Sequence, residues 1–315
     1  MYFADAVSGR VVAWGDLPSD WTGNTSILGT VQSFGRPFTA VVELRRADSG
    51  ALMFFQTGEC FHQIKFGQRE RHREGAFDER TMMPEATFRF PESYLDRLAL
   101  FYSGYRPVKL FAKEAFPGFL EEPEMVAELK RSTERLEELC SMGILVDLQN
   151  VFADATLRTY RLESEEGVFT LCLAAEITAT EYCLRTATDS LYARRVVTPV
   201  DGMNLGVGMT VATIRKRAGG RFGSAKTGGA KAAYIDWEAR KVFGLLSAGE
   251  PNQNTISVLR NWIASFRIDP ELYPAMKRAA ADADPEQLRE QNAEYIALSE
   301  RERDRRFSII RGGIQ

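Results

Sequence analysis

The chain has 315 residues, of which 44% are hydrophobic and 26% are charged, and its formal net charge is −3. This composition is typical of a folded globular protein with one large or two modest domains, and it excludes a disordered chain. The charge balance also excludes a uniformly basic surface, so any site for a polyanion must be local.

No segment approaches the roughly 18 apolar residues that a membrane-spanning helix needs, and the first residues lack the pattern of a signal peptide. The four cysteines form no Cys-x-x-Cys pair, and we expect them to be reduced, buried thiols. With only two histidines, His62 and His72, a multi-histidine metal site is excluded. We therefore expect a cytoplasmic protein that has no cofactor and no membrane association.

The first 115 residues are predicted to be mainly strands. Segments 38–46 and 51–57 are rich in β-branched and apolar residues, and the turn-forming segment 47–50 between them indicates a β-hairpin. Segment 91–102 is predicted to be a short helix, because its apolar residues share one helical face. We expect His62 to be a structural histidine within a strand. Shorter strands are expected at 10–14, 61–66, 86–90 and 108–112.

The centre of the chain is predicted to begin with a helix and continue with a second hairpin. Pro123 fits the first position of a helix that ends before Gly143, and apolar residues recur along it at spacings of three and four. Segments 156–163 and 168–178 flank an acidic turn that ends in Gly167, which indicates a hairpin. The spacing of residues within 181–195 indicates a further helix.

The C-terminal region is predicted to be helical. Asn254 or Thr255 can cap a helix that runs to about Phe266. Two Asp-Pro-Glu segments, at 269–271 and 284–286, begin further helices. The charged last helix, 285–307, is expected either to pack weakly or to dock on a partner subunit.

The expected fold class is therefore α+β, with strand-rich N-terminal and central parts made mainly of antiparallel hairpins and a helical C-terminal region. Three regions are predicted: a strand-rich domain at 1–115, a helix plus β-hairpin domain with a basic, glycine-rich loop at 116–250, and a helical region at 251–315.

One segment departs from the average composition. No acidic residue lies between Asp201 and Asp236, and the core of this interval, residues 215–231, is here called the first basic segment. Its glycines give the backbone freedom, and its cations repel one another unless an anion gathers them. Phe222, Tyr234 and Trp237 could stack on unpaired bases. Its cations are Arg215, Lys216, Arg217, Arg221, Lys226 and Lys231.

A second basic segment covers residues 65–73, although Glu70 dilutes its charge. Phosphate backbones are the usual partners of such segments, because Lys and Arg neutralise phosphates and release counterions. The two segments could line one groove. The residues of this segment expected to bind nucleic acid are Lys65, Arg69, Arg71, His72 and Arg73.

Two other patterns bear on catalysis. Residues 220–227 differ from a phosphate-binding P-loop by Ala225, and the two glycines that follow oppose the helix which that motif requires, so nucleotide hydrolysis is not expected. Asp236 and Glu238 share one face if 232–238 is a strand, which would suit a divalent metal or acid–base catalysis. Their ordinary interpretation is as exposed acids on an edge strand.

We therefore expect a non-catalytic protein that binds nucleic acid, RNA or single-stranded DNA, as a subunit of a larger ribonucleoprotein or DNA-processing assembly. Its C-terminal helices would contact the other protein subunits. The first alternative is a structural or assembly protein of a virus or mobile element. The second is a metal-dependent enzyme that uses Asp236 and Glu238.

Overall fold

Within the described residues of this computed structural model, most residues lie in antiparallel strands, and two α-helices, α1 and α5, accompany them. This confirms that the chain is strand-rich. The structure describes residues 1–5, 9–16, 20–33, 36–57, 60–66, 69–70, 77–78, 83–84, 86–115, 145–165, 167–184 and 232–272.

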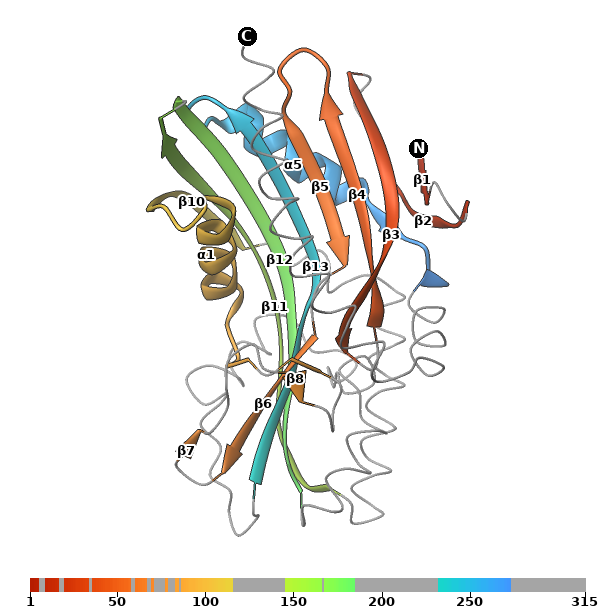
Figure 1. Cartoon of the computed structure of the whole chain (residues 1–315), viewed down its shortest axis with the longest axis vertical. Coiled ribbons are helices and arrows are strands. Elements are labelled where there is room, and N and C mark those ends of the chain that lie inside the picture. Colours follow the sequence, from red (N-terminus) through yellow and green to blue (C-terminus); the bar gives the residue numbers. More distant parts are fainter. Residues whose placement is uncertain are drawn as a thin grey trace.

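A long antiparallel sheet forms the centre of the molecule, with the strand order β10-β11-β12-β13-β5-β4-β3 (Figure 1). Strand β6 pairs with the first part of β13, and β5 pairs with the part that follows. The sheet combines strands from both of the first two regions expected from the sequence. The strands are β3 (Trp21–Ser33), β4 (Arg36–Arg46), β5 (Leu52–Thr57), β6 (Cys60–Phe66), β7 (Arg69–Glu70), β10 (Val108–Ala115), β11 (Leu145–Ser164), β12 (Gly167–Leu184) and β13 (Ala232–Ala248).

Two smaller sheets complete the described part. One has the strand order β1-β2-β14 and the other pairs β8 with β9. The end of the central sheet at which β12 ends and β13 begins is here called the lower end, as it is drawn in Figure 1. The remaining elements are β1 (Tyr2–Ala4), β2 (Val11–Trp14), β8 (Phe77–Asp78), β9 (Met83–Pro84), β14 (Arg267–Ile268), α1 (Pro91–Tyr102) and α5 (Gln253–Ser265).

Both predicted hairpins are confirmed. Strands β4 and β5 pair around a turn that ends at Gly50, and β11 and β12 pair around a turn that ends at Gly167. Both glycines have a positive φ, 62° and 128°, which glycine adopts without the steric penalty of a Cβ. The second hairpin is longer than predicted, and its strand β12 includes residues 181–184. The helix predicted from residue 181 is therefore wrong for those residues.

The other predictions have mixed outcomes. Helix α1 is confirmed, as are the strands near 10–14, 61–66 and 108–112, whereas residues 86–90 lie outside any strand. Helix α5 is capped by Asn252, whose side chain accepts a hydrogen bond from the Thr255 N–H at 2.9 Å, so its cap precedes the predicted one. The helices predicted at 123–142 and 285–307, and the rest of 181–195, lie outside the described residues.

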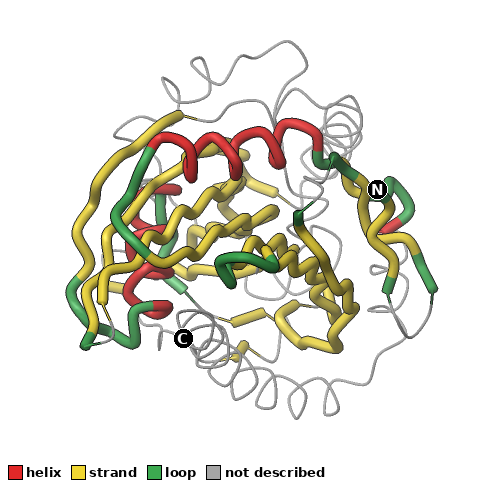
Figure 2. The backbone as a smooth tube through the Cα atoms, turned by 90° about the horizontal axis from the view of Figure 1, so that it is seen from above, coloured by secondary structure: helices red, strands yellow, loops and turns green. Residues whose placement is uncertain are grey.

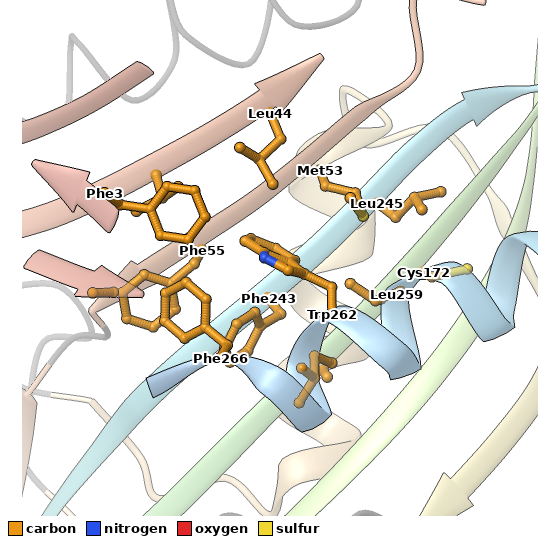
Figure 3. Close-up of a cluster of buried hydrophobic side chains, with 14 of the residues drawn as sticks. Phe3, Leu44, Met53, Phe55, Cys172, Phe243, Leu245, Leu259, Trp262 and Phe266 are labelled. Carbon is orange, nitrogen blue, oxygen red and sulfur yellow. The ribbon is translucent and has the colours of Figure 1, made fainter. Parts of the chain in front are cut away.

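The two helices cover opposite faces of the central sheet, which Figure 2 shows from above. Helix α5 packs Leu259, Trp262 and Ile263 onto Phe55 and Phe243 of one face (Figure 3). Burying each such side chain contributes about 1.5–3 kcal/mol. Helix α1 packs on the other face, in a separate cluster that extends to the lower end of β13.

Polar contacts hold both helices on the sheet. Asp96 of α1 accepts hydrogen bonds from the Arg158 guanidinium at 2.5 Å and from the Tyr160 hydroxyl at 2.8 Å. Burial and the neighbouring Asp96 carboxylate raise the pKa of Tyr160, so this phenol remains a donor. On the other face, Arg260 of α5 donates to Glu114 of β10 at 2.5 Å. Each helix is thus fixed to the β10–β11 side of the sheet.

Candidate functional site

The face of the sheet under α5 changes from apolar to charged toward the lower end. Strand β12 carries Cys172 and Ala174 on this face and then Glu176 and Thr178. Strand β13 changes in the same way, since Phe243 packs under α5 and Lys241 precedes it. These polar side chains are as buried as the core. We call the following residues the buried polar band: Thr57, Glu176, Thr178, Glu238, Arg240 and Lys241.

A β-bulge concentrates positive charge beside Glu176. In the ladder between β12 and β13, Glu176 pairs with Lys241 and Ile177 pairs with Ala239, so Arg240 is the additional residue of the bulge. Its Nε lies 3.8 Å from Oε1 of Glu176, which is 0% exposed. A buried carboxylate is expensive without compensating positive charge, so the bulge supplies two cations where one acid is enclosed.

The candidate acids Asp236 and Glu238 do not lie on an edge strand. Strand β13 is central, because it pairs with β12 on one side and with β5 and β6 on the other. Glu238 is 0% exposed. The ordinary interpretation of these residues as exposed acids of an edge strand is therefore wrong for Glu238. Of Asp236, the structure describes the backbone position, opposite Thr180 and His62.

Trp237 is part of the core and is not available to stack on bases. Its side chain is 1% exposed, its Nε1 donates a hydrogen bond to the Ala86 carbonyl at 3.1 Å, and its ring lies 4.4 Å from that of Phe61. The prediction that Trp237 stacks on nucleic acid is therefore wrong. Tyr234 is described by its backbone position alone, and Phe222 lies outside the described residues.

The strand register brings the boundaries of the two basic segments together. Lys65, near the end of β6, is the register partner of Ala233, which follows the last cation of the first basic segment by two positions. Ala232 pairs with Leu184 on the other side. The chain therefore leaves β6 and enters β13 at the same end of the sheet.

Most of the predicted nucleic-acid contacts lie outside the described residues. Lys65 lies in β6 and Arg69 lies in β7, opposite Phe66. The predicted contacts outside the described part are Arg215, Lys216, Arg217, Arg221, Phe222, Lys226, Lys231, Arg71, His72 and Arg73.

Glu176 and Arg240 were not predicted from the sequence to belong to a site. A usable signal was present, since polar residues alternate from Glu176 to Thr180 while apolar residues fill the positions between them. This pattern is typical of a strand with one polar face, which normally faces solvent. In the structure, Glu176 and Thr178 are instead buried.

The thiol of Cys172 lies beneath α5, among the apolar side chains of Figure 3. Burial raises the pKa of this thiol to about 11, although the Thr159 hydroxyl lies within hydrogen-bonding distance at 3.5 Å. A thiol in this environment stays protonated at neutral pH and is a poor nucleophile. The prediction of a buried, reduced cysteine is confirmed at this position.

Neither α1 nor α5 is long and apolar enough to cross a membrane. Among the side chains that the structure describes, no three His, Cys, Asp or Glu residues gather closely enough to hold a metal ion. Comparison with protein-family models, with curated proteins and with solved structures finds no match. The function must therefore be argued from this chain's own chemistry.

Proposed function

We propose that this protein binds nucleic acid, RNA or single-stranded DNA, by holding its phosphate backbone with the two basic segments at the lower end of the central sheet. The observation that carries the proposal is the pairing of Lys65 with Ala233. The second segment begins in β6 and the first segment is followed by β13, so the two segments adjoin paired strands although they are far apart in the sequence.

The electrostatic argument concerns the local charge. The chain as a whole has a net charge of −3, which gives no general attraction for a polyanion. The first basic segment contains six cations and no acid, and a phosphate backbone offers one negative charge per nucleotide. Contacts of this kind fix the nucleic acid in position and carry no sequence preference.

The role we propose is that of a non-catalytic, cytoplasmic subunit of a larger ribonucleoprotein or DNA-processing assembly. The antiparallel sheet would serve as a rigid platform for the basic segments. The residues after α5 would contact the other subunits. With Trp237 in the core, base stacking would fall to Phe222 and Tyr234.

The test is binding of a fluorescently labelled single-stranded RNA, measured by anisotropy over a range of salt concentrations. Replacing Arg215, Lys216 and Arg217 by glutamate should weaken binding and lower the slope of log K against log salt by about 2, since each lost phosphate contact removes about 0.7. An equal slope in this variant and in wild type would contradict the proposal.

The matched control reverses the same number of charges at the other end of the sheet. Arg106, Lys109 and Lys113 are exposed and lie on or just before β10, which pairs with the upper part of β11. Replacing these three by glutamate changes the net charge equally and should leave the salt slope within error of wild type. An equal loss in both variants would show that only overall charge matters.

A second candidate function, self-assembly, is favoured by one observation. Strand β10 is an edge strand of the described sheet, and its Leu110 and Phe111 are 41% and 52% exposed. Edge strands with exposed apolar residues are templates for pairing with another chain. If this function is correct, light scattering should detect a dimer that Phe111→Lys abolishes, and a concentration-independent monomer would exclude it.

A further inference from the structure

Strand β10 forms one margin of the central sheet (Figure 1). Among the strands that the structure describes, it pairs with β11 alone. About half of the backbone N–H and C=O groups of such a strand point away from its neighbour, where a further strand can bind them. Leu110 and Phe111 are exposed on this strand, so an added strand would also contact apolar surface.

The register of β10 places cations directly opposite cations. Lys109 is the partner of Arg161, and Lys113 is the partner of Arg158. Like charges at directly opposite positions of an antiparallel pair are destabilising. The pairing with β11 therefore does not account for either lysine.

The acids around these pairs bind the arginines. Asp96 accepts a hydrogen bond from Arg158 at 2.5 Å. Glu250 accepts two hydrogen bonds from Arg161, at 2.8 Å and 2.9 Å. A two-point contact between a guanidinium and a carboxylate is a strong, oriented one. Both carboxylates are thus already engaged by β11.

The one acid of β10 is engaged as well, since Glu114 accepts a hydrogen bond from Arg260 of α5 at 2.5 Å. Among the described side chains, no acid forms a salt bridge with Lys109 or Lys113. Arg106, which precedes the strand, is also exposed. The free margin of β10 therefore carries a surplus of positive charge.

This surplus distinguishes between two possible occupants of the edge. A second copy of β10 would bring its own Arg106, Lys109 and Lys113 to the same edge, and like charges across an interface oppose association. A strand with acidic residues would instead place opposite charges beside the lysines, which stabilises cross-strand pairs. The charges therefore favour a different, acidic strand.

Tyr105 adds an aromatic side chain beside this edge. Its φ is 62°, the one positive φ of a non-glycine residue in the described part of the chain, and its N–H donates to the Leu100 carbonyl at 2.7 Å. Such a conformation costs about 1–3 kcal/mol and persists only where surrounding contacts enforce it. It keeps an exposed tyrosine 6.4 Å from the ring of Phe101, and tyrosine is enriched at the centres of protein interfaces.

We propose that β10 receives an acidic, extended segment of a partner protein, which adds as a further strand to the central sheet. Main-chain hydrogen bonds supply the affinity in this mode of binding, and side chains supply the specificity. The lysines would select acidic residues, and Leu110 and Phe111 would contact apolar ones. This surface lies at the upper end of the sheet, so the proposal does not depend on nucleic-acid binding.

The test uses the full-length chain and an array of synthetic peptides of about ten residues, which combine valine and threonine with either glutamate or lysine at varied positions. Wild type should bind glutamate peptides at least about tenfold more tightly than the matching lysine peptides. Replacing Arg106, Lys109 and Lys113 by glutamate should reverse this preference. No binding by wild type, or an unchanged preference in the variant, would overturn the proposal.

The matched control reverses three charges of the first basic segment. Replacing Arg215, Lys216 and Arg217 by glutamate should leave the preference for glutamate peptides intact, although this variant is expected to lose RNA binding. The two triple variants therefore separate a failure of this proposal from a failure of the proposed function. A preference that is lost in the control variant would place the peptide on the first basic segment and would overturn the proposal.

Hydrogen exchange followed by mass spectrometry locates the added strand in wild type, without any substitution. The tightest glutamate peptide should slow exchange of the amides in residues 108–115 and leave residues 253–265 unchanged, because it binds the outward N–H groups of β10. Protection confined to residues 65–73 or 215–231 would contradict the site. Protection of residues 108–115 that depends on protein concentration and not on the peptide would assign the edge to a second copy and would overturn the proposal.

Discussion

The described side chains in the upper and lower halves of one face of the sheet, the face on which α5 packs, are equally buried and chemically opposite. In the upper half, Phe243 packs against both Phe55 and Trp262. In the lower half, the same strand β13 carries Lys241 and Glu238, which are 3% and 0% exposed. Burial therefore does not distinguish the two halves, and only the chemistry of the side chains does.

The two halves are expected to contribute differently to the stability of the fold. Apolar contacts in the upper half gain free energy by leaving water. Buried ion pairs of the kind formed by Glu176 and Arg240 often contribute little or negative net stability, because desolvation offsets their attraction. We infer that the upper half maintains the fold and that the lower half is retained for another role.

The largest effect is expected from removing the central side chain of the upper half. Trp262→Ala should lower the free energy of unfolding by about 3–5 kcal/mol, because it removes a fully buried indole that contacts Phe243 and Phe266. Urea unfolding followed by circular dichroism measures this change. A loss below about 1 kcal/mol would mean that α5 is not the main apolar cover of this face.

In the lower half, we expect a smaller loss of stability, which a second substitution should partly reverse. Arg240→Met should cost about 3 kcal/mol, because it removes a compensating charge from the enclosed carboxylate of Glu176. Adding Glu176→Gln should recover a large part of that loss, since the charge itself is then gone. The double-mutant cycle, measured by urea unfolding, isolates the coupling between the two residues. Purely additive losses would show that the pair is not coupled.

The smallest effect concerns the thiol beneath α5. The pKa of Cys172 is raised from 9.0 to about 11, so the fold favours the neutral thiol. Its contribution to stability is complete below the lower value and is lost as the pH rises toward the higher one. Between about pH 8 and about pH 10.5, wild type should lose about 2 kcal/mol more than Cys172→Ala. Identical pH profiles would show that Cys172 ionises equally in both states.

Local patterns in the sequence predicted the hairpins well. The turns before Gly50 and Gly167 are short and are flanked by residues that favour strands, so both the turn and the pairing follow from neighbouring residues. Helix α1 was predictable for the same reason, since its apolar residues recur at helical spacing.

Features that depend on distant strands were not predictable. Residues 181–184 are spaced as in a helix, yet they continue β12 because it is paired on both sides. Residues 86–90 have the composition of a strand, but their Ala86 carbonyl and Phe88 N–H bind side chains rather than a neighbouring strand. Long-range pairing overrides local propensity in such segments.

The candidate site also has features that the sequence predicted and features that it did not. The composition of the first basic segment is visible in the sequence, whereas the pairing of Ala233, two residues after that segment, with Lys65 depends on the contact between β6 and β13. The burial of Glu238 and Trp237 depends on the central position of β13, which no local pattern reveals. The sequence therefore predicted where basic residues concentrate, but it did not predict which strands lie side by side.

Ultraviolet crosslinking of a labelled single-stranded RNA to the intact protein, followed by peptide mass spectrometry, tests the proposed function most directly. If neighbouring strands present both basic segments to one nucleic acid, crosslinked peptides should come from residues 65–73 and from residues 215–231 of the same chain. Crosslinks confined to α1 and β10, or absent from both segments, would contradict it.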